Sequence, residues 1–222
     1  IWDCETLARI GALCKQYDVI VVSDEIHCDL TKPGTEYIPF ASVDDTCRDI
    51  SVTCIAPTKT FNLAGLQTAA VYAENSILHH RMWRQLNTDE VAEPNAFAIQ
   101  ATIAAFQYGE EWLDELREYV EKNKQYVTEF LQEKIPLIHP VAGDATYLMW
   151  LDCRKITESG RQFVKFIRKT SGLYVSGGNQ YGRGGEGFLR VNVATSKLVV
   201  EDGMQRLYES VDAWLKEEKI SK

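Results

Sequence analysis

Apolar positions in the first third of the chain follow two different spacings. Four of them recur at the spacing of one helical face: Leu7, Ile10, Leu13 and Cys14. Three short, largely apolar runs follow, at residues 19–22, 51–55 and 69–73, and each has the length of a β-strand. Continuous apolar strands are typical of a sheet that is covered by helices on both faces. This region therefore predicts part of an α/β domain.

Two long helical patterns come next. The first has apolar positions across residues 97–106, with Pro94 expected in its first turn and Gly109 at its end. The second carries an apolar stripe over residues 112–131 and is expected to end at Pro136.

Beyond Pro136 the pattern becomes that of a small α+β unit. Strands are predicted at residues 145–151, 173–175 and 188–193, and amphipathic helices at residues 159–170 and 200–215. We therefore expect residues 1–135 to belong to a large α/β domain and residues 136–222 to form a small C-terminal domain. The chain starts without Met and enters a helical pattern almost at once, so we expect residue 1 to lie within a longer protein. An artificial start of the expressed chain, or a removed tag, would look the same.

The net charge of the chain argues against some classes of binding partner. The 222 residues contain 32 acidic and 24 basic side chains, for a formal charge of −8, which disfavours nucleic acid or an anionic membrane surface. No apolar run reaches the length of a membrane span, and no signal peptide is visible. Size and composition are those of an ordinary soluble globular protein.

The six cysteines form no CxxC pair and show no zinc-ligand spacing. Several lie in apolar runs, where a reduced thiol behaves as a small hydrophobic group. We therefore expect reduced thiols and a cytoplasmic location. His79 and His80 lack acidic or cysteine companions, so no metal site is predicted.

Three segments carry candidate chemistry. Asp24 follows the first apolar run, at the carboxyl end of a predicted strand, where open α/β sheets bind ligands. Lys59 follows the second run on a predicted turn among apolar neighbours, where desolvation would favour a neutral, nucleophilic amine. Arg190 lies inside the apolar strand at 188–193, where a guanidinium requires a planar anion such as a carboxylate. Taken singly, each also has an ordinary explanation: a surface acid, a solvated turn lysine or a structural ion pair.

Together and in this order, residues 23–27, 56–67 and 188–194 resemble the motifs of fold type I pyridoxal-phosphate enzymes, the aminotransferase class I and II superfamily. The resemblance covers essentially the whole chain and is closest to the bacterial cystathionine beta-lyase subgroup, also called C-S lyases. It implies an α/β fold in which this chain is the C-terminal part: the remainder of the large doubly wound domain plus the small domain. It also implies a homodimer, with further cofactor contacts supplied by an earlier part of the protein.

The resemblance implies specific roles. Lys59 would hold pyridoxal 5'-phosphate as a Schiff base and shuttle the proton at the substrate Cα. Asp24 would pair with the pyridinium nitrogen, and Arg190 would bind the α-carboxylate of an amino-acid substrate.

Two positions separate the subfamilies. His27 stands where aminotransferases carry a tyrosine on the cofactor's phenolic oxygen, and Gln67 where they often carry an arginine on its phosphate. Both departures resemble the C-S lyase pattern. A serine that often holds the phosphate is replaced by Ala56, so Thr58 is expected to supply a hydroxyl instead.

The leading hypothesis is therefore a lyase that performs α,β-elimination on cystathionine or a related cysteine S-conjugate. An aminotransferase on the same scaffold is the enzymatic alternative, because a fold does not determine a reaction. A non-catalytic regulatory or binding fragment is the third hypothesis.

Overall fold

The computed structural model describes residues 1–220, which form two units that meet within helix α6 (Glu110–Lys134). The first unit is Ile1–Arg117, and the second begins at Glu118. The sequence placed the boundary at the end of this helix, near Ile135, whereas the contacts divide the helix itself. A long helix can contribute one end to each of two cores, so the domain assignment 1–135 and 136–222 stays a prediction. No helix among residues 1–220 is long and apolar enough to cross a membrane.

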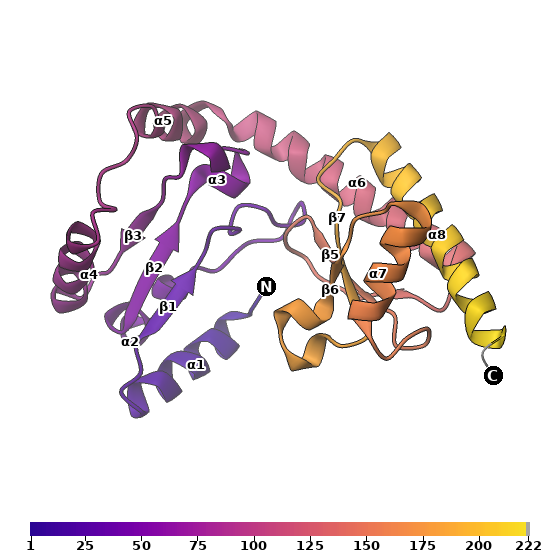
Figure 1. Cartoon of the computed structure of the whole chain (residues 1–222). Helices are drawn as coiled ribbons and strands as arrows, with labels where there is room; N and C mark the ends of the chain where they lie inside the picture. Colours follow the sequence, from indigo (N-terminus) through magenta and orange to yellow (C-terminus); the bar gives the residue numbers. More distant parts are fainter. Residues whose placement is uncertain (221–222) are drawn as a thin grey trace. The chain divides into compact units, whose positions relative to one another are not determined.

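The sheet of the first unit contains the three expected strands, β1 (Val21–Asp24), β2 (Ser51–Ile55) and β3 (Ala70–Tyr72) (Figure 1). Their order is β1-β2-β3, with β1 parallel and β3 antiparallel to the central strand. The first strand begins at Val21 rather than at residue 19, because the pairing with β2, its one neighbour in this sheet, starts at Val21.

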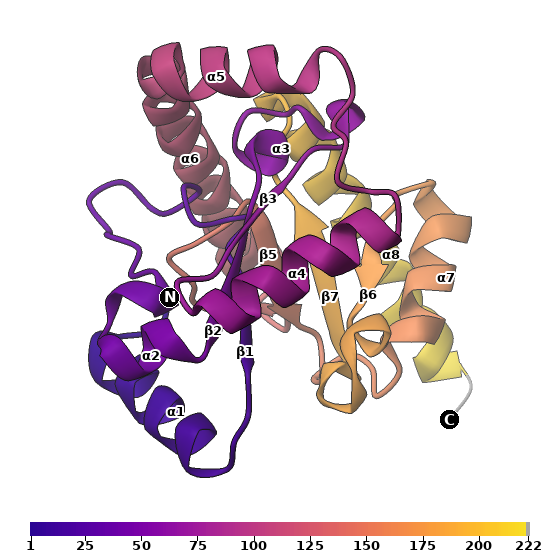
Figure 2. The ribbon, with the colours of Figure 1, turned by 90° about the vertical axis from the view of Figure 1, so that its left-hand side faces the viewer.

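Helices cover both faces of this sheet, each over a limited area. On one face, α1 (Cys4–Gln16) and α2 (Asp45–Asp49) bury Leu7 and Cys47 together with Phe40, and Val21 of β1 packs against them. On the other face, α4 (Ser76–Thr88) lies across the sheet (Figure 2) and buries Leu78 against β2 and β3. The expectation of a doubly covered sheet is therefore confirmed in outline.

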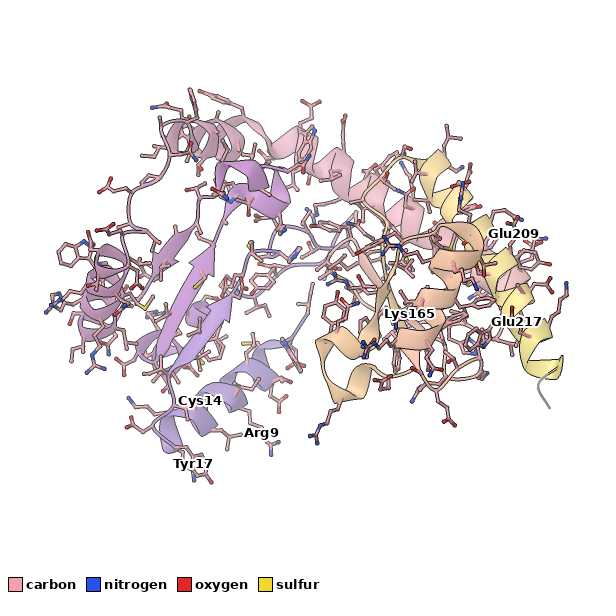
Figure 3. All side chains as sticks on the ribbon, in the orientation of Figure 1. Arg9, Cys14, Tyr17, Lys165, Glu209 and Glu217 are labelled. Atoms are coloured by element: carbon pink, nitrogen blue, oxygen red, sulfur yellow. The ribbon has the colours of Figure 1, made fainter. Side chains whose placement is uncertain are left out.

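The cover on the α4 face does not extend over β1. Val22 pairs in register with buried Val52, which places both on that face, yet Val22 is 66% exposed. Side chains alternate between faces along a strand, so Asp24 lies on the same face as Val22. Polar side chains lie on the outer side of several helices: Figure 3 labels Arg9 on α1, Lys165 on α7 and Glu209 on α8.

Helix α5 (Ala98–Tyr108) begins later than its apolar pattern suggested. Pro94 lies before the helix and not in its first turn, because the Asn95 side chain accepts a hydrogen bond from the Phe97 N–H at 3.0 Å and holds a preceding turn. Gly109 ends α5 as expected. Phe61 packs edge-on against Phe106 of this helix, with 5.3 Å between ring centroids.

The second unit is an antiparallel sheet packed on two further helices and on the part of α6 from Glu118 onward. Its strands are β4 (His139–Pro140), β5 (Leu148–Asp152), β6 (Ser176–Gly177) and β7 (Phe188–Asn192), in the order β4-β5-β7-β6. Its helices are α7 (Gly160–Ser171) and α8 (Lys197–Ile220). The largest fully buried side chains include Leu131, Leu151, Phe163, Leu189 and Met204.

The strand expected at residues 173–175 is wrong. Pairing with β7 begins only at Ser176, and Gly172 with φ of 72° ends the preceding helix. Tyr174 is 74% exposed, with the Arg168 guanidinium 4.8 Å from its ring centroid. This residue therefore packs on the end of α7 instead of joining the sheet.

Candidate active site

Asp24 is the last residue of β1, at the carboxyl edge of the parallel pair β1–β2. Its side chain is exposed, and its Oδ1 accepts a hydrogen bond from the Ile26 N–H at 3.3 Å. The next residue continues the pairing, because the Glu25 N–H donates to the Cys54 carbonyl at 2.9 Å. An acid presented at this edge matches the place where open α/β sheets bind ligands.

Glu25 points the opposite way and is only 4% exposed. Its Oε1 accepts hydrogen bonds from the Ser23 hydroxyl at 2.9 Å and from the Phe40 N–H at 3.2 Å. Burial, with the nearby Glu25 charge as a further cause, raises the pKa of Tyr37 to about 12. Through the hydrogen bond from the Phe40 N–H, Glu25 holds the segment at Phe40 close to the end of β1. No motif indicates this role of Glu25, although alternation along a strand would place one of the two acids, Asp24 and Glu25, outside and the other inside.

Lys59 lies on a short helix, α3 (Pro57–Thr60), that begins two residues after β2. Pro57 occupies a first helical position, where its missing N–H costs no hydrogen bond. The neighbours Thr58 and Thr60 are buried, whereas the Lys59 side chain is exposed. The expected enclosure by apolar neighbours is therefore wrong for this chain. The helix turns its other side chains inward and presents the amine outward.

A hydrogen bond joins the lysine helix to the segment that follows β1. Thr60 is fully buried, and its hydroxyl donates to Asp29 Oδ2 at 2.9 Å. Burial raises the pKa of the Cys28 thiol to about 12, and the negative charges of Asp29 and Glu25 act in the same direction. His27 lies in this segment and is partly buried. The bond therefore links the segments that carry Lys59 and His27.

We expect Thr60→Val to lower the free energy of unfolding by about 1.5–3 kcal/mol, because the Asp29 carboxylate loses a charge-assisted hydrogen bond from a buried donor. Thr60→Ser is the matched control, since it keeps the hydroxyl and loses one methyl group, worth roughly 1 kcal/mol. Urea denaturation of the cofactor-free full-length protein measures both. A valine variant as stable as the native protein would show that this bond does not stabilise the fold.

The groups at this edge fit a pyridoxal-type cofactor in their chemistry. An exposed amine and an exposed carboxylate follow adjacent parallel strands, which suits an aldehyde and a pyridinium nitrogen, respectively. Thr58 is 8% exposed, and its carbonyl accepts from the Leu63 N–H at 3.0 Å. Its role toward a phosphate, like that of His27 toward the phenolic oxygen, stays a prediction.

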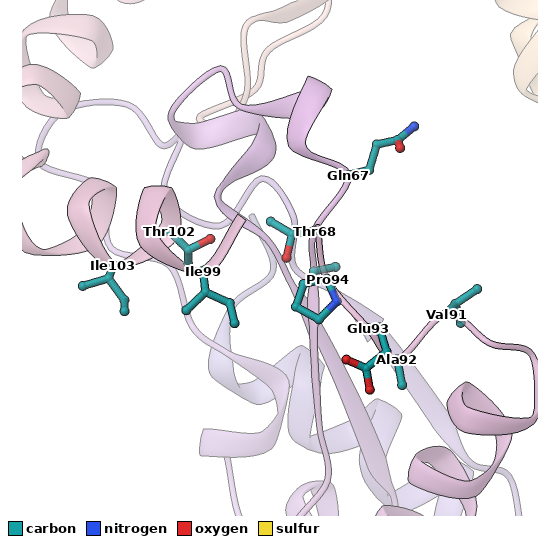
Figure 4. Close-up of a pocket in the computed structure, with 10 residues that line it drawn as sticks. Gln67, Thr68, Val91, Ala92, Glu93, Pro94, Ile99, Thr102 and Ile103 are labelled. Carbon is teal, nitrogen blue, oxygen red and sulfur yellow. The ribbon is translucent and has the colours of Figure 1, made fainter. Parts of the chain in front are cut away.

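A groove of about 310 Å³ lies between the segment at Gln67 and the start of α5 (Figure 4). Gln67 has a left-handed backbone, with φ of 49°, and its side chain points away from the other labelled residues in Figure 4. The polar lining includes Thr68, Thr102 and the Glu93 carboxylate. A carboxylate in the lining opposes an anionic ligand, so we do not assign this groove to a phosphate.

Arg190 lies in the middle of β7 in the second unit, directly opposite Trp150 of β5. Its side chain is partly buried, and its guanidinium carbon lies 4.3 Å from the centroid of the Tyr181 ring. Burial raises the pKa of Tyr147, and the positive charge of Arg190 acts in the opposite direction. Within residues 118–217 no carboxylate forms an ion pair with Arg190. This second unit therefore presents a cation whose charge is not neutralised within the unit.

Comparison with known proteins identifies the family. Residues 1–207 match the family model described as aminotransferase class I and II. Cystathionine beta-lyase PatB from Bacillus subtilis is 40% identical over 206 residues, which are 93% of this chain and 53% of that protein. Protein MalY from Escherichia coli is 30% identical and covers 96% of this chain and 54% of its own length. The chain thus spans about half the length of these relatives.

Solved structures agree with this match. Cystalysin from Treponema denticola, which contains pyridoxal 5'-phosphate, superposes with a TM-score of 0.92 at 27% identity, over 96% of this chain and 54% of that one. The pyridoxal-phosphate-bound C-S lyase from Staphylococcus hominis gives 0.84 at 32% identity, over 95% and 54% of the two chains. Since the family model matches nearly the whole chain, this protein belongs to the aminotransferase class I and II family.

Proposed function

We propose that the full-length protein is a pyridoxal-phosphate-dependent C-S lyase that performs α,β-elimination on cystathionine or a related cysteine S-conjugate. The products would be a thiol, pyruvate and ammonia. The observation that carries the proposal is the 40% identity to a cystathionine beta-lyase across 93% of this chain. The exposed pair Asp24 and Lys59, at the edge formed by β1 and β2, supports it.

In this proposal the chain supplies the amine and the carboxylate that work on the cofactor. Pyridoxal phosphate, when bound, supplies an electron sink for charge that develops at the substrate Cα. The Lys59 amine holds the cofactor covalently and moves the proton at Cα. The Asp24 carboxylate keeps a proton on the ring nitrogen by pairing with it. Both groups are exposed and can therefore reach a ligand.

Recognition of the substrate falls to Arg190. A guanidinium presents N–H donors in a plane that matches the two oxygens of a carboxylate. Its lack of an ion-pair partner within residues 118–217 supports a role in binding an anion from outside the unit. This contact would orient the bond at Cα that is to be broken.

The second candidate is an aminotransferase. The family name and the 24% identity to an aspartate aminotransferase from Bacillus subtilis favour it. His27 and Gln67 favour the lyase, because both depart from the residues that the resemblance assigns to aminotransferases. The two reactions are distinguished by their products.

We also propose a homodimer in a reducing, cytoplasmic compartment. All six cysteines are free, and Cys47 and Cys153 are buried, which suits a compartment where thiols stay reduced. Exposed apolar side chains on and before α5, among them Phe97, Ile99 and Phe106, leave apolar surface for contacts with further protein. The homodimer itself rests on the family resemblance.

With L-cystathionine as substrate, we expect the full-length, cofactor-loaded protein to release pyruvate and a thiol without an added keto acid. Lactate dehydrogenase coupling measures the pyruvate, and a thiol reagent measures the second product. An equimolar yield of the two supports elimination. Turnover that requires a keto-acid acceptor and yields no thiol would establish the aminotransferase instead.

A further inference from the structure

The Arg190 side chain lies on an aromatic cluster that the catalytic proposal leaves unexplained. Tyr181 has the Arg190 guanidinium over its ring at 4.3 Å. The same ring meets Trp150 edge-on, with 5.7 Å between centroids, and Trp150 stacks on Phe188 at 5.6 Å. Trp150 is also the residue paired with Arg190 across β5 and β7. The guanidinium therefore has aromatic neighbours from the facing strand and from the segment before β7.

Close backbone packing fixes the position of Tyr181. It ends the turn η3 (Gly178–Tyr181), which is followed by η4 (Arg183–Gly185). A Cβ added to Gly178 would lie 2.3 Å from the Gly185 carbonyl oxygen, and one added to Gly185 would lie 2.0 Å from the Gly178 carbonyl oxygen. Only glycine permits this approach. The glycine-rich segment is thus folded onto itself, and Tyr181 is held beside β7.

A second guanidinium in the unit shows what Arg190 lacks. Arg154 lies over the Phe188 ring at 4.9 Å, but its Nε and an Nη atom donate to Asp152 at 2.9 and 2.6 Å. That bidentate pair lowers the Asp152 pKa to about 2. Arg190 has the aromatic contact without such a carboxylate within residues 118–217. An aromatic ring restrains a guanidinium through its face and uses none of the N–H donors.

We propose that Tyr181, supported by Trp150, is a positioning residue that holds the Arg190 guanidinium on its ring face so that the N–H donors stay oriented for a substrate carboxylate. This inference rests on the proposed role of Arg190 and extends it to the side chain that restrains it. The ring face is the active element, because the phenol hydroxyl takes no part in the contact. Pre-orienting the guanidinium reduces the side-chain conformational entropy that Arg190 loses when a carboxylate binds.

Tyr181→Leu tests the proposal in the full-length, cofactor-loaded protein. We expect KM for an L-cysteine S-conjugate to rise roughly 2- to 30-fold, the range of a cation–π contact, with kcat within about twofold. Calorimetric Kd for propionate, a carboxylate probe that does not react, should rise by a similar factor. Tyr181→Phe keeps the ring face and should restore both constants. Tyr181 is 48% exposed, so neither change should prevent folding.

Tyr174→Leu is the matched control, because it removes the same kind of contact, with Arg168, from the surface of the unit. It should leave KM and propionate binding unchanged. If Tyr181→Leu leaves both constants unchanged while Arg190→Lys weakens them, the positioning role is refuted and the carboxylate role of Arg190 stands. If Arg190→Lys also leaves both unchanged, the proposed role of Arg190 itself is refuted. Equal weakening by Tyr174→Leu would likewise overturn the positioning role.

Discussion

Replacing Lys59 by alanine is expected to abolish covalent retention of pyridoxal phosphate and to lower kcat by roughly 10²–10⁴-fold or more, since one amine is assigned both attachment and proton transfer. The exposed amine on α3, beside the carboxyl edge of β1 and β2, motivates the expectation. Borohydride reduction followed by peptide mass spectrometry should find the reduced cofactor on Lys59 in the native protein. The same treatment should find none on the variant.

Lys15→Ala provides a matched control. Lys15 is an exposed lysine of the same unit, and its amine pairs with Asp49 at 2.9 Å. Its removal should leave labelling and turnover unchanged. Labelling of another lysine in the native protein, with Lys59 unmodified, would refute the assignment. Full turnover by Lys59→Ala would refute the mechanism even if the cofactor stayed bound by other contacts.

The elements that could be predicted from sequence are those whose pattern depends on local burial. The strands β2 and β7 agree with their predicted ranges to within one residue. Spacing alone determines which positions face a core, and these elements bury one face within their own unit. The family also followed from the sequence, because three motifs in one order are far more specific than any one of them.

The errors arose where side-chain contacts in the folded chain, and not the spacing of apolar residues, decide the outcome. Lys59 was expected among apolar neighbours, but the short helix α3 buries Thr58 and Thr60 and turns the lysine outward. The strand expected at 173–175 failed because Tyr174 packs against Arg168. Neither outcome follows from local spacing, since each depends on what the folded chain brings alongside.

Glu25 and Tyr181 were missed for the same reason. Glu25 is explained by the Phe40 amide that it binds, 15 positions further along. Tyr181 is explained by the mutual approach of Gly178 and Gly185, which brings its ring beneath Arg190. A glycine-rich stretch predicts backbone freedom but does not indicate which two glycines meet. Residues of this kind are found by geometry, whereas the candidates Asp24 and Lys59 are proposed from motifs.

Replacing Arg190 by alanine is expected to lower kcat/KM by tens- to thousands-fold, equivalent to the roughly 2–5 kcal/mol lost when one partner of a hydrogen-bonded charge pair is removed. The cation lies in the middle of β7, with no carboxylate partner within residues 118–217. Covalent attachment of the cofactor at Lys59 should survive, because Arg190 is assigned to the substrate only. Arg190→Lys should recover little, since a point charge cannot reproduce two parallel hydrogen bonds.

The competing explanation makes Arg190 a structural ion pair, and three measurements on Arg190→Ala distinguish it. A structural role predicts a lower melting temperature together with lower activity, whereas a recognition role predicts an unchanged melting temperature. The native protein should strongly prefer an amino acid over the matching amine that lacks the carboxylate, and Arg190→Ala should lose this preference. Propionate should also bind the variant more weakly. A variant that keeps the full preference for the carboxylate would end the proposal that Arg190 binds it, whatever its effect on stability.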